Sequence, residues 1–166
     1  MIKTIYDDHI RWERYSKEDI IRGKFQQEEW HQIVGDINSE EEWQNFVFKY
    51  SNYIKCWVLK NNRTNLPIAF VYIFNEGNNW EKVSIHGGAW GNPLLHFRGY
   101  ILILKQLLEQ GLKVRTYCKI SNAAAIRFDR SVGFVPYRYT NDEVYMWITE
   151  KSLKGTKLYR RLYPND

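Results

Sequence analysis

The sequence has 166 residues, which is enough for one domain with a hydrophobic core and short for two. Apolar residues make up 44% of the chain and charged residues 26%, a balance typical of globular proteins rather than of disordered or membrane-embedded ones. The net charge of +5 favours an acidic ligand, either a nucleic acid or a phosphorylated cofactor.

Location and redox state follow from a few short features. Every apolar run, residues 101–104 included, is too short to span a bilayer, and polar residues interrupt the start of the chain before a signal peptide can form. Cys56 and Cys118 lie in strand-like contexts, where buried free thiols are common. We therefore expect a cytoplasmic protein with no disulfide, no bound metal and no membrane partner.

The first third of the chain predicts a strand followed by helices. Residues 10–15 alternate as a strand does and lead into a helix that begins near Ser16. Ser39 and Glu42 match a capping box, in which each side chain accepts from the other residue's backbone N–H. The apolar positions that follow repeat at helical spacing, which predicts a helix through Tyr50.

The middle of the chain predicts an antiparallel meander of three strands. Residues 54–60 and 68–74 are rich in β-branched and aromatic side chains, and the polar run 61–65 joins them. Residues 77–79 form a turn, and residues 80–86 supply the third strand.

A long amphipathic helix is predicted next. Asn92 suits the N-cap, and Pro93 suits the first helical position because its missing N–H has no intrahelical partner to lose. Gly111 suits the C-terminal cap. The apolar stripe that faces the core is Leu94, Phe97, Ile101, Leu104 and Leu108.

The last third completes an α/β fold. Residues 114–120 predict a strand, residues 122–132 a helix closed by Gly133, and residues 134–139 and 144–149 two more strands. The basic tail, residues 150–166, is expected to be helical. This order predicts a single domain over residues 1–166, with a mixed, mostly antiparallel sheet, helices on both faces and one βαβ crossover.

Residues 122–134, Asn-Ala-Ala-Ala-Ile-Arg-Phe-Asp-Arg-Ser-Val-Gly-Phe, carry a family resemblance. Together with the element order, this stretch resembles the GNAT (Gcn5-related N-acetyltransferase) superfamily, in which a helix after the fifth strand reads Asn, two variable residues, Ala-Ile, a variable and an apolar residue, Tyr, three residues, Gly-Phe. One position departs from that pattern, because the tyrosine is Asp129. The resemblance covers roughly residues 10–149 and implies transfer of an acyl group, most simply from acetyl-CoA, to an amine.

The resemblance also implies where the acyl-CoA binds. Two parallel strands of the family's sheet part and admit the pantetheine arm, with Asn122 capping a helix at the mouth of this slot and Phe128 burying its ring beside it. The pyrophosphate loop is expected at residues 88–93, where free backbone N–H groups at a helix N-terminus can hold a diphosphate. The expected cofactor-binding residues are Ile85, Gly87, Gly88, Ala89, Trp90, Gly91, Asn92, Leu94, Asn122 and Phe128.

Two alternatives to this loop stay open at the level of sequence. The family's usual Gln or Arg is a glycine here, so residues 88–93 also fit an ordinary Gly-rich turn. A rival register places the loop at residues 96–99, with the helix beginning near Tyr100.

His86 and Asp129 are the candidate catalytic residues. His86 ends a strand that faces the slot, and a histidine of pKa about 6.5 suits removal of the amine proton. Glu76 and Glu81 are weaker candidates for that base, since both are expected to face solvent. An ionised Asp129 would repel the departing thiolate, so it is protonated, turned away or paired with Arg127 or Arg130.

The acceptor has no readable motif. The principal alternative to an enzyme is a GNAT-fold binding or regulatory module that lost catalysis. A nucleic-acid-binding domain is the weakest reading, since no helix-turn-helix, zinc or RNP-type motif is present. A homodimer is possible through the last strands, where Tyr137, Tyr139, Tyr145 and Trp147 serve either an interface or the core.

Overall fold

The computed structural model describes residues 5–15, 39–50, 52–89 and 92–166. All of its strands join one eight-stranded sheet in the order β1-β2-β3-β4-β5-β6-β8-β7. The strands are β1 (Ile5–Tyr6), β2 (Ile10–Tyr15), β3 (Ile54–Asn61), β4 (Pro67–Asn75), β5 (Lys82–Ala89), β6 (Lys113–Lys119), β7 (Val135–Tyr139) and β8 (Glu143–Ile148). The helices are α3 (Glu40–Tyr50), α4 (Pro93–Glu109), α5 (Ala123–Ser131), α6 (Glu150–Lys154) and α7 (Lys157–Leu162).

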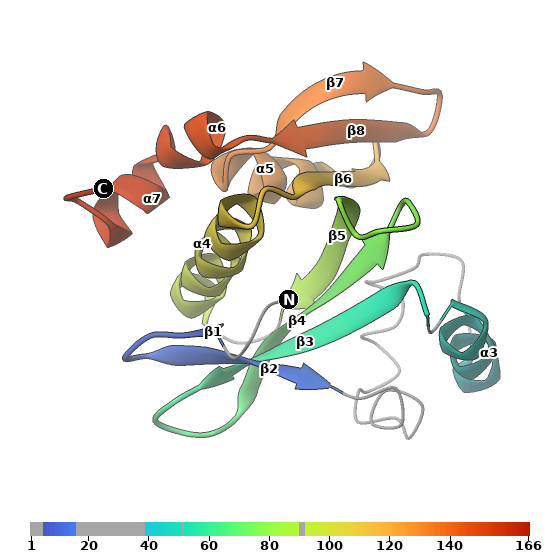
Figure 1. The fold of residues 1–166 in the computed structure, drawn as a ribbon, viewed down its shortest axis with the longest axis horizontal. Coiled ribbons are helices and arrows are strands. Elements are labelled where there is room, and N and C mark those ends of the chain that lie inside the picture. The colour runs from blue at the N-terminus through green and yellow to red at the C-terminus, as the bar shows by residue number, and fades with distance from the viewer. Residues whose placement is uncertain (1–4, 16–38, 51, 90–91) are drawn as a thin grey trace.

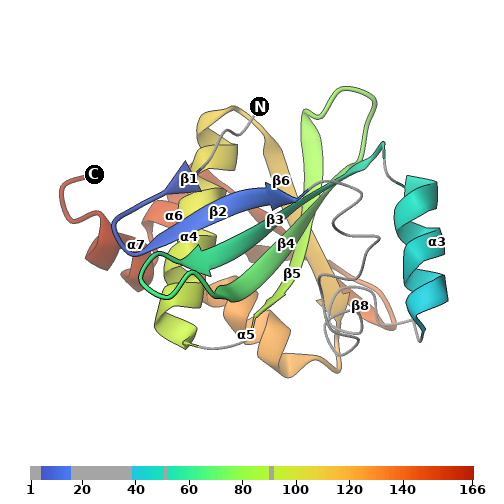
Figure 2. The same cartoon turned by 90° about the horizontal axis from the view of Figure 1, so that it is seen from below.

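The sheet is mixed and mostly antiparallel, as predicted. Only β5 and β6 pair in parallel, and α4 makes the crossover between them. Figures 1 and 2 show α4 packed across one face of the sheet, with α6 and α7 beside it and α3 apart at the other end. The expected helix beginning at Ser16 lies outside the described residues. In the described part of the chain, no helix is long and apolar enough to cross a membrane.

Local sequence explains most element boundaries. Asn92 caps α4 and accepts the Leu94 N–H at 2.9 Å, while Gly111 follows the helix with a φ of +77°. Before α3, the Glu42 N–H donates to Ser39 Oγ at 3.2 Å, one of the two hydrogen bonds of the predicted capping box. The helical tail is two short helices, and Thr149 opens the first of them with a reciprocal cap to Ser152.

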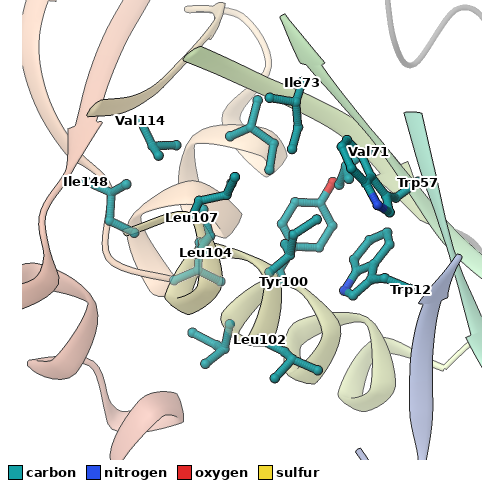
Figure 3. Packing of buried hydrophobic residues seen from close by; sticks show 14 of the residues in the cluster. Trp12, Trp57, Val71, Ile73, Tyr100, Leu102, Leu104, Leu107, Val114 and Ile148 are labelled. Carbon is teal, nitrogen blue, oxygen red and sulfur yellow. The ribbon is translucent and has the colours of Figure 1, made fainter. Parts of the chain in front are cut away.

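The core lies between the sheet and α4. Figure 3 shows Tyr100 of α4 beside Trp12, Trp57 and Val71, with its hydroxyl directed toward the strands. The buried Trp12 indole N–H donates to the Gly99 carbonyl oxygen at 2.8 Å, which ties β2 to the middle of α4. A buried hydrogen bond of this kind fixes the position of the helix on the sheet as well as adding stability.

Candidate functional site

The two parallel strands part along most of their length. β5 and β6 are in register only from Lys82 to Ser84 and from Lys113 to Arg115. Beyond those residues, β5 stays paired with β4 and β6 stays paired with β8. The predicted parting of the parallel strands is therefore present, and the backbone N–H groups of β5 that point toward this opening have no ladder partner on β6.

His86 lies on β5 beside this opening. Its ring makes edge contacts with Phe74 of β4, with ring centroids 5.5 Å apart, and with Tyr117 of β6, with centroids 4.5 Å apart. Its Nε2 atom is buried and has no hydrogen-bond partner among the described residues. Burial, helped by the positive charge of Arg115, lowers the pKa of His86 to about 4. The imidazole is therefore neutral at pH 7, with one nitrogen able to accept or donate a hydrogen bond.

The start of α4 settles the register of the expected pyrophosphate loop. The helix begins at Pro93, and residues 96–99 lie within it, so the rival register is wrong. Gly88 and Ala89 are paired with β4 in strand β5, which runs three residues past its predicted end, so they belong to the strand rather than to a loop. Trp90 and Gly91 lie outside the described residues.

The first turn of α4 offers fewer free donors than expected. The Leu94 N–H, predicted to be free, donates to the Asn92 side chain, because that residue acts as the N-cap. The His96 N–H is bonded to the Asn92 carbonyl at 3.2 Å. Among the described residues, this leaves the Leu95 N–H for an anion at the helix N-terminus. Leu94 is 75% exposed, so it is not part of the core stripe.

Gly87 is enforced by the packing of α4. A Cβ atom at this position would lie 1.9 Å from the Tyr100 hydroxyl and 2.3 Å from the Phe70 carbonyl oxygen. The Tyr100 hydroxyl itself lies 3.4 Å from that carbonyl oxygen. Any side chain at Gly87 would push α4 and β4 apart beside the opening.

We expect Gly87→Ala to destabilise the protein by about 2–3 kcal/mol, since overpacking against backbone cannot be relieved by a rotamer change. Urea denaturation measures this loss. Adding Tyr100→Phe should restore little of it, because the clash with the Phe70 carbonyl remains. Gly77→Ala is the matched control, since the nearest atom to its Cβ would be 3.7 Å away. Equal stability of Gly87→Ala and the wild type would contradict this packing.

The helix α5 brings Asn122, Phe128 and Asp129 to the other side of the opening. Asn122 caps the helix and accepts the Ala125 N–H at 3.1 Å. Phe128 stacks on His96 of α4, with ring planes 7° apart and centroids separated by 4.7 Å, and lies 4.9 Å from the Tyr100 ring. The ring is thus packed against α4 but is only partly buried, so the predicted burial is incomplete.

Asp129 is a carboxyl group placed in an apolar setting. Burial raises its pKa from 3.8 to about 7. Within the described residues it forms no ion pair, so the expected pairing with Arg127 or Arg130 is wrong. Its charge also contributes to raising the pKa of the Tyr100 hydroxyl and of the Cys118 thiol, after the larger effect of burial on each. These three groups therefore form one electrostatic cluster beside the opening.

The two glutamates considered as bases differ in environment. Glu76 was expected to face solvent, but its side chain is 13% exposed and is held by Arg115, whose Nε lies 2.6 Å from Oε1. Lys82 lies 3.7 Å from the other oxygen of Glu76. Glu81 is exposed, as expected. Neither glutamate is free and buried as a catalytic base would need to be.

Sequence reasoning missed several members of the site. Tyr100 and His96 are four residues apart on α4, so helical spacing places both on the face toward α5 and the sheet. Tyr117 faces His86 because alternate residues of β6 point to one face. Among the described residues, no group of three or more His, Cys, Asp or Glu side chains could hold a metal ion.

Comparisons with known proteins agree with this architecture. No family model and no curated protein sequence matches the chain. A GNAT-family acetyltransferase from Bacillus anthracis superposes with a TM-score of 0.68 at 15% identity, over 90% of this chain and 99% of that one. A nucleotide-linked sugar GNAT, FdhC in its apo form, gives 0.69 at 10% identity, over 99% and 98%.

A third solved structure holds coenzyme A. RimL, a ribosomal L7/L12 α-N-protein acetyltransferase, superposes with a TM-score of 0.64 at 12% identity, over 89% of this chain and 99% of that one. These likenesses, together with the parted parallel strands, establish the architecture. The chain therefore has the GNAT fold, the fold of the Gcn5-related N-acetyltransferase superfamily.

Proposed function

We propose that the chain is an acyl-CoA-dependent N-acyltransferase that uses acetyl-CoA and an amine acceptor. The observation that carries this is the opening between β5 and β6, which has His86 with an unpartnered nitrogen beside it and Asp129 with a raised pKa. Perturbed titratable groups gathered beside one opening are typical of catalytic sites.

Binding of the acyl donor would use backbone more than side chains. The pantetheine arm would lie in the opening, along Ile85 to Ala89, and the diphosphate would lie near the Leu95 N–H at the start of α4. Asn122 and Phe128 would border the arm from α5. The described residues fit a pantetheine arm, because beyond Ser84 the backbone N–H and C=O groups of β5 that face the opening have no partner on β6.

The chemistry would need one base and one acid. Neutral His86 would take the proton of the attacking amine as its nitrogen bonds to the thioester carbon. A β5 N–H that faces the opening would stabilise the resulting oxyanion. The C–S bond then breaks, and protonated Asp129 would give its proton to the departing sulfur. A thiol of pKa about 8.5 is already a fair leaving group, so this last step would help modestly.

The first test is thermal unfolding with acetyl-CoA, coenzyme A and a longer acyl-CoA. At about a hundred times the dissociation constant, a ligand stabilises by roughly 2.7 kcal/mol. For a domain of this size, that should raise the midpoint by about 5–10 °C. If none of the three ligands raised the unfolding midpoint, the proposal of an acyl-CoA-dependent enzyme would be refuted. Binding without release of coenzyme A across a panel of amines would favour the non-catalytic module instead.

The acceptor, the oligomeric state and the cellular location stay predictions. The acceptor is not fixed by the likenesses, since one similar protein modifies the N-terminal serine of a ribosomal protein and another, FdhC, is a nucleotide-linked sugar GNAT. A homodimer through the last strands and a cytoplasmic location are likewise proposed here. Gel filtration with light scattering would decide the first of these.

A further inference from the structure

The face of the sheet opposite α4 and α5 carries a row of aromatic rings on β6, β7 and β8. We call Tyr117, Tyr137, Tyr145 and Trp147 the aromatic platform. Tyr117 and Tyr145 are directly opposite each other on neighbouring strands and stack with centroids 5.2 Å apart. Tyr137 and Trp147 extend the row, with centroids 5.2 Å apart. The opposite face of β8 carries Val144, Met146 and Ile148, which are buried in the core.

Basic side chains lie on and around this platform. Arg138 lies over the Tyr145 ring at 4.5 Å, Arg115 lies over the same ring at 5.6 Å, and Lys82 lies over Trp147 at 5.5 Å. Glu76 neutralises part of this charge by pairing with Arg115 and Lys82. Arg138, in contrast, is exposed and has no carboxylate partner in the described part of the chain.

A second carboxylate on this face, that of Glu143, is also engaged. Glu143 accepts the Tyr145 hydroxyl at 2.8 Å and lies opposite Lys119 on β6. The platform is therefore aromatic with a positive rim; Tyr137 is exposed, and the other three rings are partly buried. A planar ring that carries a negative charge complements both properties, because rings stack on tyrosine and phosphate binds arginine. A peptide N-terminus would bring an ammonium toward these cations and fits less well.

The platform also reaches the candidate reaction site. Tyr117 belongs to it and contacts His86 with ring centroids 4.5 Å apart. A ligand stacked on the rings would thus extend toward the opening between β5 and β6. We propose that the aromatic platform with Arg138 recognises a nucleotide moiety of the acceptor, an inference that rests on the proposed acyltransferase function.

The test measures binding of UMP, which lacks the adenine of coenzyme A, by calorimetry to the full-length protein. We expect saturable binding that persists when acetyl-CoA is saturating. Uridine and ribose 5-phosphate should each bind at least tenfold more weakly, since each lacks one half of the recognised chemistry. Tyr145→Ala and Arg138→Gln should each weaken UMP binding by about tenfold or more. Tyr6→Ala, which removes a 73% exposed tyrosine on β1, is the matched control and should bind UMP normally.

Each other outcome overturns the inference in an identifiable way. Absence of UMP binding in a protein that binds acetyl-CoA overturns the platform alone. Displacement of UMP by coenzyme A assigns it to the cofactor site, and binding of a uridine hexamer without UMP assigns the surface to nucleic acid. UMP binding in a protein that ignores every acyl-CoA overturns the acceptor role together with the proposed function. Arg138→Gln keeps the test valid if Tyr145→Ala does not fold, because Arg138 is an exposed edge residue.

Discussion

Replacing Asp129 by asparagine should stabilise the protein above pH 7 by about 3 kcal/mol relative to its effect at pH 4. The folded-state pKa of about 7 lies roughly three units above the ordinary value of 3.8, and each unit corresponds to about 1.36 kcal/mol. The Asp129 side chain is partly exposed, so the expected energy is somewhat smaller than the pKa difference multiplied by the energy per unit. The asparagine amide cannot ionise, so the variant would not lose this stability as pH rises.

The direction follows from proton binding. As pH rises through 3.8, the unfolded chain loses the Asp129 proton, but the folded protein keeps it until about pH 7. The unfolded state therefore binds fewer protons in this window, and wild-type stability falls from this group as pH rises from about 4 to 7. Above pH 7 both states are ionised, and the loss is constant.

Chemical denaturation of wild type and Asp129→Asn at pH 4 and pH 8 measures this difference. Other titrating groups are common to both proteins and cancel. Asp142→Asn is the control, because Asp142 is exposed and its replacement should leave the pH dependence unchanged. If Asp129→Asn and wild type showed the same pH dependence, the carboxyl would have an ordinary environment and could not serve as the acid.

A cost of this size is informative about function. A partly buried carboxyl without an ionic partner is destabilising, and a neutral residue would pack as well. Residues that reduce stability in this way are typical of sites where chemistry requires them. Asp129 meets that description beside Tyr100 and Cys118, whose pKa values it helps to raise.

Most of the fold could be predicted because local signals agree with the global pattern. Asn92 and Gly111 bracket α4, and the strand β2 spans residues 10–15 as predicted. β1 was missed, since its two residues, Ile5 and Tyr6, are too few to show a period. Trp80 was placed in a strand but has a φ of +60°, a turn conformation that its aromatic side chain does not signal.

The site was harder to predict because its geometry depends on tertiary contacts. Gly88 and Ala89 were expected in a loop, yet both pair with β4 as part of strand β5, and α4 approaches this strand closely at Gly87. Glu76 follows a strand end, where carboxylates usually face solvent, and only the fold brings Arg115 from β6 to it. Asp129 could be located from its motif, but its solitary burial could not be read from the neighbouring arginines.

His86→Gln should lower kcat by about a hundredfold or more with a suitable amine, since glutamine can hydrogen-bond but cannot accept the amine proton. His9→Gln is the control, because His9 is exposed and lies at the β1–β2 turn. A turnover number within twofold of wild type for His86→Gln would show that another group or a water chain removes the proton. Thermal unfolding of the variant separates this effect from loss of the fold.

The pH dependence of kcat distinguishes a catalytic His86 from a His86 with only a structural role. With His86 lowered to about 4, activity should show no acidic limb near 6.5 and should fall only as pH approaches 4. His86 and His96 are both neutral in the folded protein, so their contribution to stability is full above pH 6.5 and declines as pH falls from there toward 4, opposite in sign to that of Asp129. Rates must therefore be measured where unfolding is negligible. The alkaline limb should lie near 7 from Asp129 and be lost in Asp129→Asn, whereas an acidic limb at 6.5 would mean that His86 is hydrated and charged during turnover.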